Sequence, residues 1–221
     1  MALSAVLVAA LTACGGESSS DAGNAGGGRQ NGDSLEGHEE EAPVVLTAAQ
    51  LQTALSGHEG IPEDWGGPSS NIYEGEKAAT FCELDARTGC AGLTAMAMRT
   101  LENQTLEELK ASVDGQTLFV KAYSFDSEAN AAVTVKAMAA AEHKEYPKAK
   151  TLKITTAAQY TEATSEEISE GDYSATVFMR TGSVVVTLWG TDLKSTADMQ
   201  PIAKSRLDRV VEVAAGKNPD A

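Results

Sequence analysis

The sequence predicts an α+β fold: a single domain in which a curved antiparallel β-sheet carries helices packed on one face. Runs rich in β-branched and aromatic residues, which are typical of strands, recur along the chain with single helical segments between them. The last two runs flank a short turn sequence, which indicates a long hairpin. No internal repeat is visible. Strands interrupted by single helices favour the α+β class.

Residues 1–13 are expected to be a signal peptide. They carry no charge, and the run is too short for a mature transmembrane helix, which needs roughly 20 apolar residues. It fits the apolar region of a signal peptide, which ends at small side chains. The first basic residue is Arg29, so we expect the true start codon to lie upstream. The alternative, a buried element of the fold, is weaker because the residues after Cys14 could not dock such a segment.

Residues 14–42 are expected to be a lipidated cysteine followed by a disordered acidic Gly/Ser tether. The segment Leu11-Thr12-Ala13-Cys14 resembles the lipobox of bacterial lipoproteins. The resemblance implies attachment of diacylglycerol to Cys14 and cleavage of the chain before it. In the segment that follows, Leu35 is the single large apolar residue. Such a composition cannot bury enough surface to fold, so it predicts a flexible spacer between membrane and domain.

Residues 43–221 are expected to form one globular domain, since this length can bury a real core. The chain of 221 residues has a net charge of −15. That charge argues against nucleic acid as a partner, because nucleic-acid binders display basic faces. Aromatic residues make up 5% of the chain, which leaves few stacking platforms for carbohydrate or single strands.

Cys82 and Cys90 are expected to form a disulfide. With Cys14 lipidated, they remain as an isolated pair, and outside the cytoplasm such a pair is typically oxidised. Closing a loop of this size would stabilise the domain by about 2.5 kcal/mol on the chain-entropy model. The alternative, a redox-active or metal-binding pair, lacks the C-x-x-C spacing and nearby histidines.

The domain begins with a predicted helix over residues 47–55, capped by Thr47. A loop rich in glycine and proline follows and contains Trp65. Trp65 and Tyr73 are the candidate ligand-binding residues. The alternative for Trp65 is that its ring packs over the edge of the core.

The middle of the domain predicts two strands and two helices. The strands cover residues 91–101 and 116–125. A short helix is expected over residues 101–112, and a longer one over 128–143. The longer helix has acids at its start and His143-Lys144 at its end, as the helix dipole prefers. Its expected buried stripe is mostly alanine: Ala129, Ala132, Val133, Ala137, Ala140 and Ala141.

The end of the domain predicts a hairpin and a terminal helix. Residues 173–180 and 183–189 flank Thr181-Gly182, and a two-residue loop there would pair Phe178 with Val185 and Ser174 with Trp189. A helix is expected over residues 198–214. Its apolar face would comprise Met199, Ile202, Ala203, Leu207, Val210, Val211 and Ala214, with Lys204, Arg209 and Glu212 on the solvent side.

Three segments carry a resemblance to a known group of proteins: Leu46-Thr-Ala-Ala-Gln-Leu51, Ile61-Pro-Glu-Asp-Trp65 and Met179-Arg-Thr-Gly-Ser-Val-Val-Val186. Together with the lipobox and the tether, they resemble secreted lipoproteins of actinobacteria, particularly of Streptomyces. More distantly, the domain is similar to the extracellular sensor domain of the mycobacterial serine/threonine kinase H. The resemblance implies a sensor-like domain. The chain departs from the kinase in that one intramolecular disulfide is possible instead of two, and we expect no attached kinase domain.

No catalytic constellation is visible in the sequence, so we expect that the protein is not an enzyme and has no cofactor or metal. The three histidines, His38, His58 and His143, lie in the predicted tether, in a loop and at a helix end. No Ser nucleophile elbow and no phosphate-binding loop after a strand accompany them.

The expected function is that of a membrane-anchored extracytoplasmic lipoprotein that binds or senses a ligand. Its expected partners are the membrane, through the lipid on Cys14, and a small molecule, a peptide or an envelope protein. Two alternatives remain open: a cell-envelope protein–protein interaction factor, and a hydrolase whose site the sequence does not reveal. The expected localisation is the extracytoplasmic face of the cell membrane.

Overall fold

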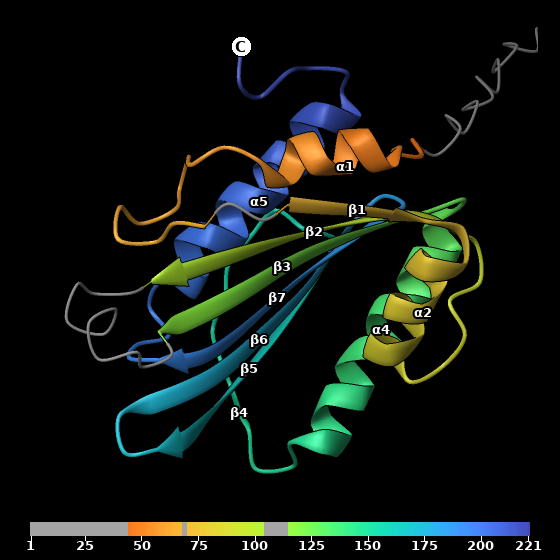
Figure 1. The fold of residues 1–221 in the computed structure, drawn as a ribbon. Helices are drawn as coiled ribbons and strands as arrows, with labels where there is room; N and C mark the ends of the chain where they lie inside the picture. Colours follow the sequence, from red (N-terminus) through yellow and green to blue (C-terminus); the bar gives the residue numbers. More distant parts are fainter. Residues whose placement is uncertain (1–43, 68–69, 104–114) are drawn as a thin grey trace, which may run out of the picture. The chain divides into compact units, whose positions relative to one another are not determined.

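The computed structural model describes residues 44–67, 70–103 and 115–221. These residues belong to one compact unit with seven strands in one antiparallel sheet, in the order β1-β2-β3-β7-β6-β5-β4 (Figure 1). The strands are β1 Ser70–Glu74, β2 Leu93–Asn103, β3 Gln116–Phe125, β4 Lys150–Thr151, β5 Tyr160–Ser169, β6 Asp172–Thr181 and β7 Val184–Leu193. The helices are α1 Ala48–Leu55, α2 Gly75–Ala86, α4 Glu128–Glu145 and α5 Met199–Ala214. The predicted single α+β domain with an antiparallel sheet is confirmed.

The helices pack on both faces of the sheet, which corrects the prediction of one face. One hydrophobic cluster joins α1 and α5 to the sheet, and a second joins α2 and α4 to its other side (Figure 1). The central strands explain this arrangement. In β7, Val184 and Val186 belong to the first cluster and Val185 to the second. A strand that is apolar on both sides requires cover on both faces.

The first predicted helix is confirmed in detail as α1. Thr47 caps it and forms a capping box with Gln50, which satisfies backbone N–H groups that the first turn leaves without partners. Leu51, Ala54 and Leu55 are fully buried. The predicted strands at 91–101 and 116–125 are confirmed as β2 and β3.

The long helix is confirmed as α4, but its predicted buried stripe is wrong. The buried residues are Ala131, Thr134, Val135, Met138 and Ala139, whereas Val133 is 68% exposed. Alanine occurs on every side of this helix, so its apolar positions give no directional signal. Met138 and Val135 supply the apolar contacts that set the orientation.

The terminal hairpin is confirmed as β6 and β7, with a correction to its register. Thr181 pairs with Val184 and Phe178 with Thr187, so the turn residues are Gly182 and Ser183. Gly182 has φ of +53°, and the first position of a type II′ turn requires positive φ. The turn therefore lies one residue later than predicted.

Several elements were not predicted, and some predicted ones fall elsewhere. The elements β1, α2, β4 and β5 were not predicted, and in β1, β4 and β5 polar residues dominate the sequence. Residues 101–103 belong to β2 and not to the predicted helix over 101–112. The remainder of that helix lies outside the described residues, as do the predicted signal peptide, Cys14 and the tether at residues 1–42.

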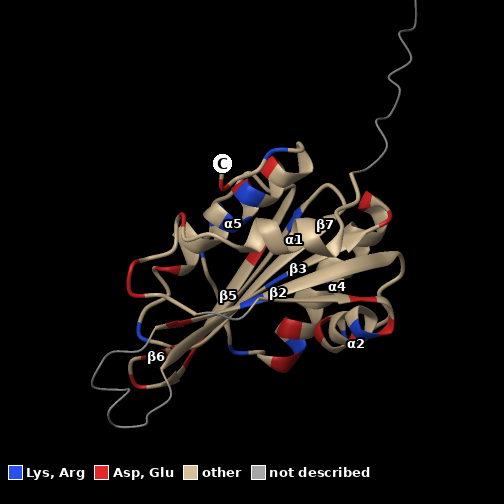
Figure 2. Ribbon diagram, turned by 45° about the horizontal axis from the view of Figure 1, so that its top comes forward, with Lys and Arg blue, Asp and Glu red and all other residues tan. Residues whose placement is uncertain are grey.

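Three buried arginines join α5 and β2 to the end of α1. Arg206 is completely buried and Arg209 is 2% exposed, so the prediction that Arg209 faces solvent is wrong. Their guanidinium groups, with that of Arg99, donate to carbonyls of residues 53–59. The last turn of a helix leaves its carbonyls without partners and carries negative partial charge, so cations are favoured there. Figure 2 shows the basic residues of α5 beside α1.

Candidate functional site

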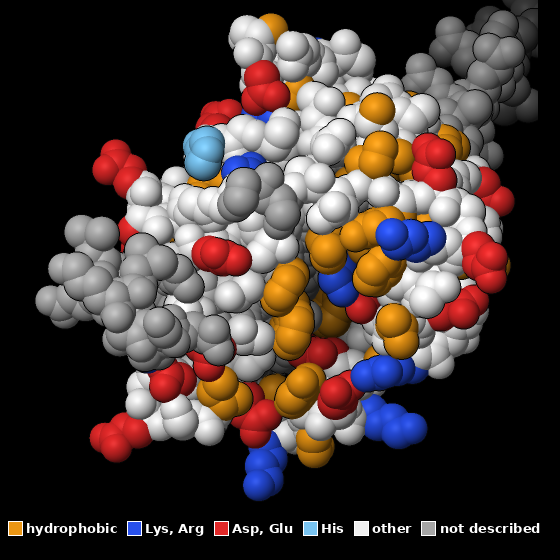
Figure 3. Space-filling view, viewed as in Figure 1, with side chains coloured by type: hydrophobic (Ala, Val, Ile, Leu, Met, Phe, Trp, Pro, Cys, Tyr) orange, Lys and Arg blue, Asp and Glu red, His pale blue; other side chains and the backbone are white. Residues whose placement is uncertain are grey.

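A groove of about 270 Å³ lies between the sheet and the helices α2 and α4. Figure 3 shows a strip of hydrophobic side chains in a hollow on this side of the domain, bordered by acidic and basic groups. The sheet contributes Lys121, Thr176, Phe178, Thr187 and Trp189, and the helices with their ends contribute Leu84, Asp85, Arg87, Met138, Ala141, Glu142, Glu145 and Tyr146. The volume is slightly below the roughly 300–1,000 Å³ of pockets that hold drug-sized molecules. The groove therefore suits a smaller ligand.

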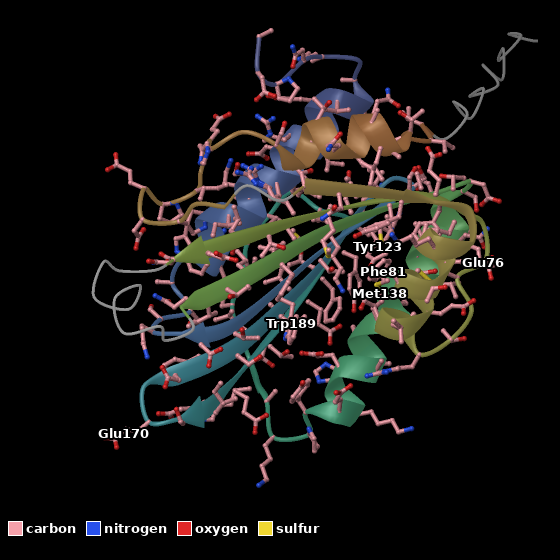
Figure 4. All side chains as sticks on the ribbon, viewed as in Figure 1. Glu76, Phe81, Tyr123, Met138, Glu170 and Trp189 are labelled. Carbon is pink, nitrogen blue, oxygen red and sulfur yellow. A yellow bond between two sulfur atoms is a disulfide. The ribbon has the colours of Figure 1, made fainter. Side chains whose placement is uncertain are left out.

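Trp189 forms the open part of the groove floor. It pairs with Phe119 across β3 and β7, and the two rings stack with their centroids 5.2 Å apart and an interplanar angle of 20°. Trp189 remains 37% exposed. Figure 4 shows Trp189 on the sheet, and Phe81, Tyr123 and Met138 where α2 and α4 pack against the sheet. An exposed aromatic ring held in place by a stacked neighbour can bind a flat ligand.

A polar cluster of Asp85, Lys121 and Tyr123 borders the floor. Helix α2 places Asp85 over β3, where Lys121 Nζ lies 2.8 Å from both carboxylate oxygens. The Tyr123 hydroxyl donates to the same carboxylate. Burial raises the pKa of Tyr123 well above its usual value, and the negative charge of Asp85 raises it further. These three groups satisfy one another, so they shape the groove without leaving a free charge.

Glu142 of α4 also lines the groove, but unlike Asp85 it has no cation bonded to it among the described residues. Its carboxylate accepts a hydrogen bond from the Thr176 hydroxyl, and burial raises its pKa above the usual value. At the rim, Glu145 is paired with Arg87 at 2.8 Å. Among the residues that the structure describes, Glu142 has no ion-pair partner. It is therefore the carboxylate of the groove whose charge is not balanced.

The disulfide between Cys82 and Cys90 is confirmed. It joins α2 to the loop that follows it, and in this loop Arg87 adopts a left-handed conformation with φ of 55°. Leu84, Asp85 and Arg87 all lie between the two cysteines and line the groove. The disulfide thus restrains one wall of the groove.

The structure does not bring the two predicted ligand-binding residues into the groove. Trp65 is 2% exposed and belongs to the cluster of α1 and α5. Its Nε1 donates to Asp198 at 3.0 Å. Its ring therefore packs in the core, as the alternative interpretation stated. Tyr73 packs against the cluster on the other face. The centroid of its ring lies 4.7 Å from the ring centroid of Phe81 and 4.7 Å from Lys77 Nζ.

The residues that line the groove could not be identified as site residues from the sequence. Trp189 was placed on a strand but not proposed as a site residue, although it is the second of two tryptophans. Trp189 and Thr187 are two positions apart on β7, so their side chains lie on the same face of the sheet. Which helix covers that face, and how far, depends on contacts distant in sequence. Within the described ranges, no group of three or more side chains could hold a metal ion, and no helix is long and apolar enough to cross a membrane.

Comparison with known proteins gives a likeness of fold to solved structures. No family model matches the chain, and no curated protein matches it. Among solved structures, the domain is similar to the extracellular domain of PknH from Mycobacterium tuberculosis, with a TM-score of 0.48 and 12% sequence identity. The match covers 76% of this chain and 93% of that one. A likeness at this level does not identify a ligand or an activity, which belong to the site and not to the fold.

Proposed function

We propose that the protein is a non-enzymatic ligand-binding or sensing module and that the groove between the sheet and the helices α2 and α4 is its binding site. The observation that carries this proposal is the half-exposed Trp189 on the floor of a concave, partly apolar groove. Small-molecule sites are typically concave and largely apolar, with a few polar groups that fix orientation. Thr176, Thr187 and Glu142 are such groups here.

The pairing of the charged groups favours binding over catalysis. Hydrolysis by two carboxylates requires both to be available for proton transfer or attack. Asp85 is bonded to Lys121 and Tyr123, and Glu145 is paired with Arg87. Glu142 therefore has no second free carboxylate beside it in the groove.

The other exposed large apolar side chains do not favour an interaction surface. Trp189 and Leu84 line the groove, and the others among the described residues are Val44 and Val45 before α1, Ile72 on β1, Val133 on α4, Ile168 on β5 and Val211 on α5. Val44 and Val45 are neighbours in the chain, the rest belong to different elements, and single exposed apolar residues are normal on protein surfaces.

We also propose that the domain is held at the extracytoplasmic face of the membrane by a lipid on Cys14. The disulfide supports export, because such bonds persist in oxidising compartments and are rare in the cytosol. The lipobox-like segment and the acidic Gly/Ser composition after it support an anchor with a spacer.

A fragment screen on the purified chain tests the binding proposal. A ligand at ten times its Kd stabilises the folded state by about 1.4 kcal/mol, which raises the Tm of a domain of this size by about 3–6 °C. We expect hits for the wild type and for the control Ile72→Ala, which removes an exposed apolar residue outside the groove. Trp189→Ala should abolish these shifts. Hits that persist undiminished in Trp189→Ala would place binding elsewhere.

A further inference from the structure

We propose that the groove takes a small molecule that joins a flat apolar group to a cationic amine, with the ring on Trp189 and the amine at Glu142. This inference rests on the proposed function, since it names the class of ligand for the same site. It follows from three features of the groove: its charge balance, its unoccupied hydrogen-bonding capacity and its size.

The charge balance of the groove leaves one carboxylate without a cation. Three carboxylates and two cations line it. Lys121 is bonded to Asp85, with both oxygens at 2.8 Å from Nζ. Arg87 is bonded to Glu145, also at 2.8 Å. Glu142 remains, and a cation from outside the domain can balance it.

Burial makes the unpaired charge of Glu142 costly. Glu142 lies partly within the wall between α4 and β6, where Thr176, itself 4% exposed, donates to it. An ionised carboxylate in such surroundings is costly unless it is paired, and its pKa rises for this reason. A bound ammonium group would offset that cost. A ligand carboxylate would add repulsion, in a chain whose net charge is already −15.

The hydrogen-bonding groups beside the floor match the donors of an amine. Thr176 occupies Oε1 of Glu142, and Oε2 makes no hydrogen bond to the residues that the structure describes. The Thr187 hydroxyl, which also lines the groove, is likewise without a hydrogen bond to them. An ammonium group carries three N–H donors and no acceptor. Carboxylate and hydroxyl oxygens can accept from it.

The aromatic and apolar side chains on the floor of the groove favour a ligand with a flat apolar group. Phe119 stacks on one side of the Trp189 ring, which holds the ring in place, while Phe178 and Met138 supply apolar contacts deeper in the groove. Aromatic ring pairs are favourable beyond the apolar area that they bury. With about 270 Å³ available, the groove has room for a molecule of one or two rings.

Calorimetric titration with three matched probes tests the inference. The probes are 2-phenylethylamine, 2-phenylethanol and 3-phenylpropionate, which share a ring and differ in the head group. At pH 7.5 we expect the amine to bind at least tenfold more tightly than the alcohol, and the carboxylate to bind more weakly still. Glu142→Gln should weaken the amine at least tenfold and leave the alcohol within twofold. The control Glu212→Gln removes the same charge from an exposed site on α5, outside the groove, and should change neither affinity.

The outcomes separate this inference from the proposed function. If the alcohol or the carboxylate binds as tightly as the amine and Trp189→Ala removes that binding, the groove is a ligand site and the amine class is wrong. Amine binding that survives Glu142→Gln contradicts the role of Glu142. If no probe binds at millimolar concentration, the amine class is wrong. If the fragment screen also gives no hit, the proposed function is wrong as well.

Discussion

Replacement of the buried Arg206 by methionine tests how the end of α1 is held. Arg206 Nη1 donates to the carbonyls of Leu55 at 2.8 Å and Ser56 at 2.6 Å, and Nη2 donates to that of Glu59 at 2.8 Å. Burial, followed by the neighbouring Arg209 and Arg99, lowers the pKa of Arg206 to about 10. It therefore remains charged at neutral pH. Methionine keeps most of the volume but donates no hydrogen bond.

The magnitude follows from which carbonyls lose their partners. The Leu55 carbonyl keeps the hydrogen bond from Arg99, and the Glu59 carbonyl keeps that from Ser205. The Ser56 carbonyl loses its donor. An unsatisfied buried acceptor costs about 1–3 kcal/mol, and hydrogen bonds from charged donors are worth about 1.5–3 kcal/mol each. Because the desolvation of Arg206 is relieved at the same time, we expect a net loss of about 2–3 kcal/mol.

Thermal and urea unfolding of the purified chain measure this loss. For a domain of this size, about 2–3 kcal/mol lowers the Tm by roughly 4–12 °C. The control is Lys204→Met, which removes an exposed cation two positions away on α5 and should change stability by less than about 0.5 kcal/mol. A loss for Arg206→Met no larger than that of Lys204→Met would refute the idea that this arginine stabilises the end of α1.

Three further predictions concern the disulfide, the groove carboxylate and the anchor. Replacing Cys82 and Cys90 by serine should cost about 2.5 kcal/mol in urea unfolding, and an unchanged midpoint would contradict a restraining role. Because the pKa of Glu142 is raised in the folded state, the folded domain binds more protons than the unfolded chain, and stability is lost as pH rises through that pKa. Glu142→Gln should therefore be more stable than the wild type at pH 7.5, with the gain absent below about pH 4; a gain equal at both pH values would argue against titration of Glu142. In bacterial cells, Cys14→Ser should move the protein from the detergent phase to the aqueous phase, and unchanged partitioning would exclude this anchor.

The fold class could be predicted because local signals agreed with long-range packing in the main elements. The cap at Thr47, the aromatic residues of β3 and the β-branched run of β7 are local features that the structure retains. The side of the sheet that helices cover could not be predicted, since it depends on both faces of the strands. The burial of Arg209 was hidden for a similar reason. A charged residue is assigned to solvent unless its partners, here the carbonyls of Thr53 and Ala54, are known.

The candidate site was less predictable than the fold. The disulfide was predicted because its two cysteines form an isolated pair close in sequence, and it restrains one wall of the groove. Trp65 was chosen for its Gly/Pro loop, but the hydrogen bond to Asp198 that helps hold it in the core joins residues distant in sequence. Glu142 and Trp189 come from a helix and a strand that meet only in the folded domain. The sequence contains many acids, and nothing local distinguishes Glu142 from the others.

The two tryptophans provide the most direct test of the central claim that the groove binds a ligand. Their indole N–H groups give separate signals in a nitrogen-15 correlation spectrum, and one belongs to the groove while the other is buried in the core. Titration with 2-phenylethylamine, or with any hit from the fragment screen, should shift the Trp189 signal in a saturable way and leave the Trp65 signal in place. A ligand that binds but shifts Trp65, or leaves Trp189 unmoved, would contradict the assignment of the groove as the binding site.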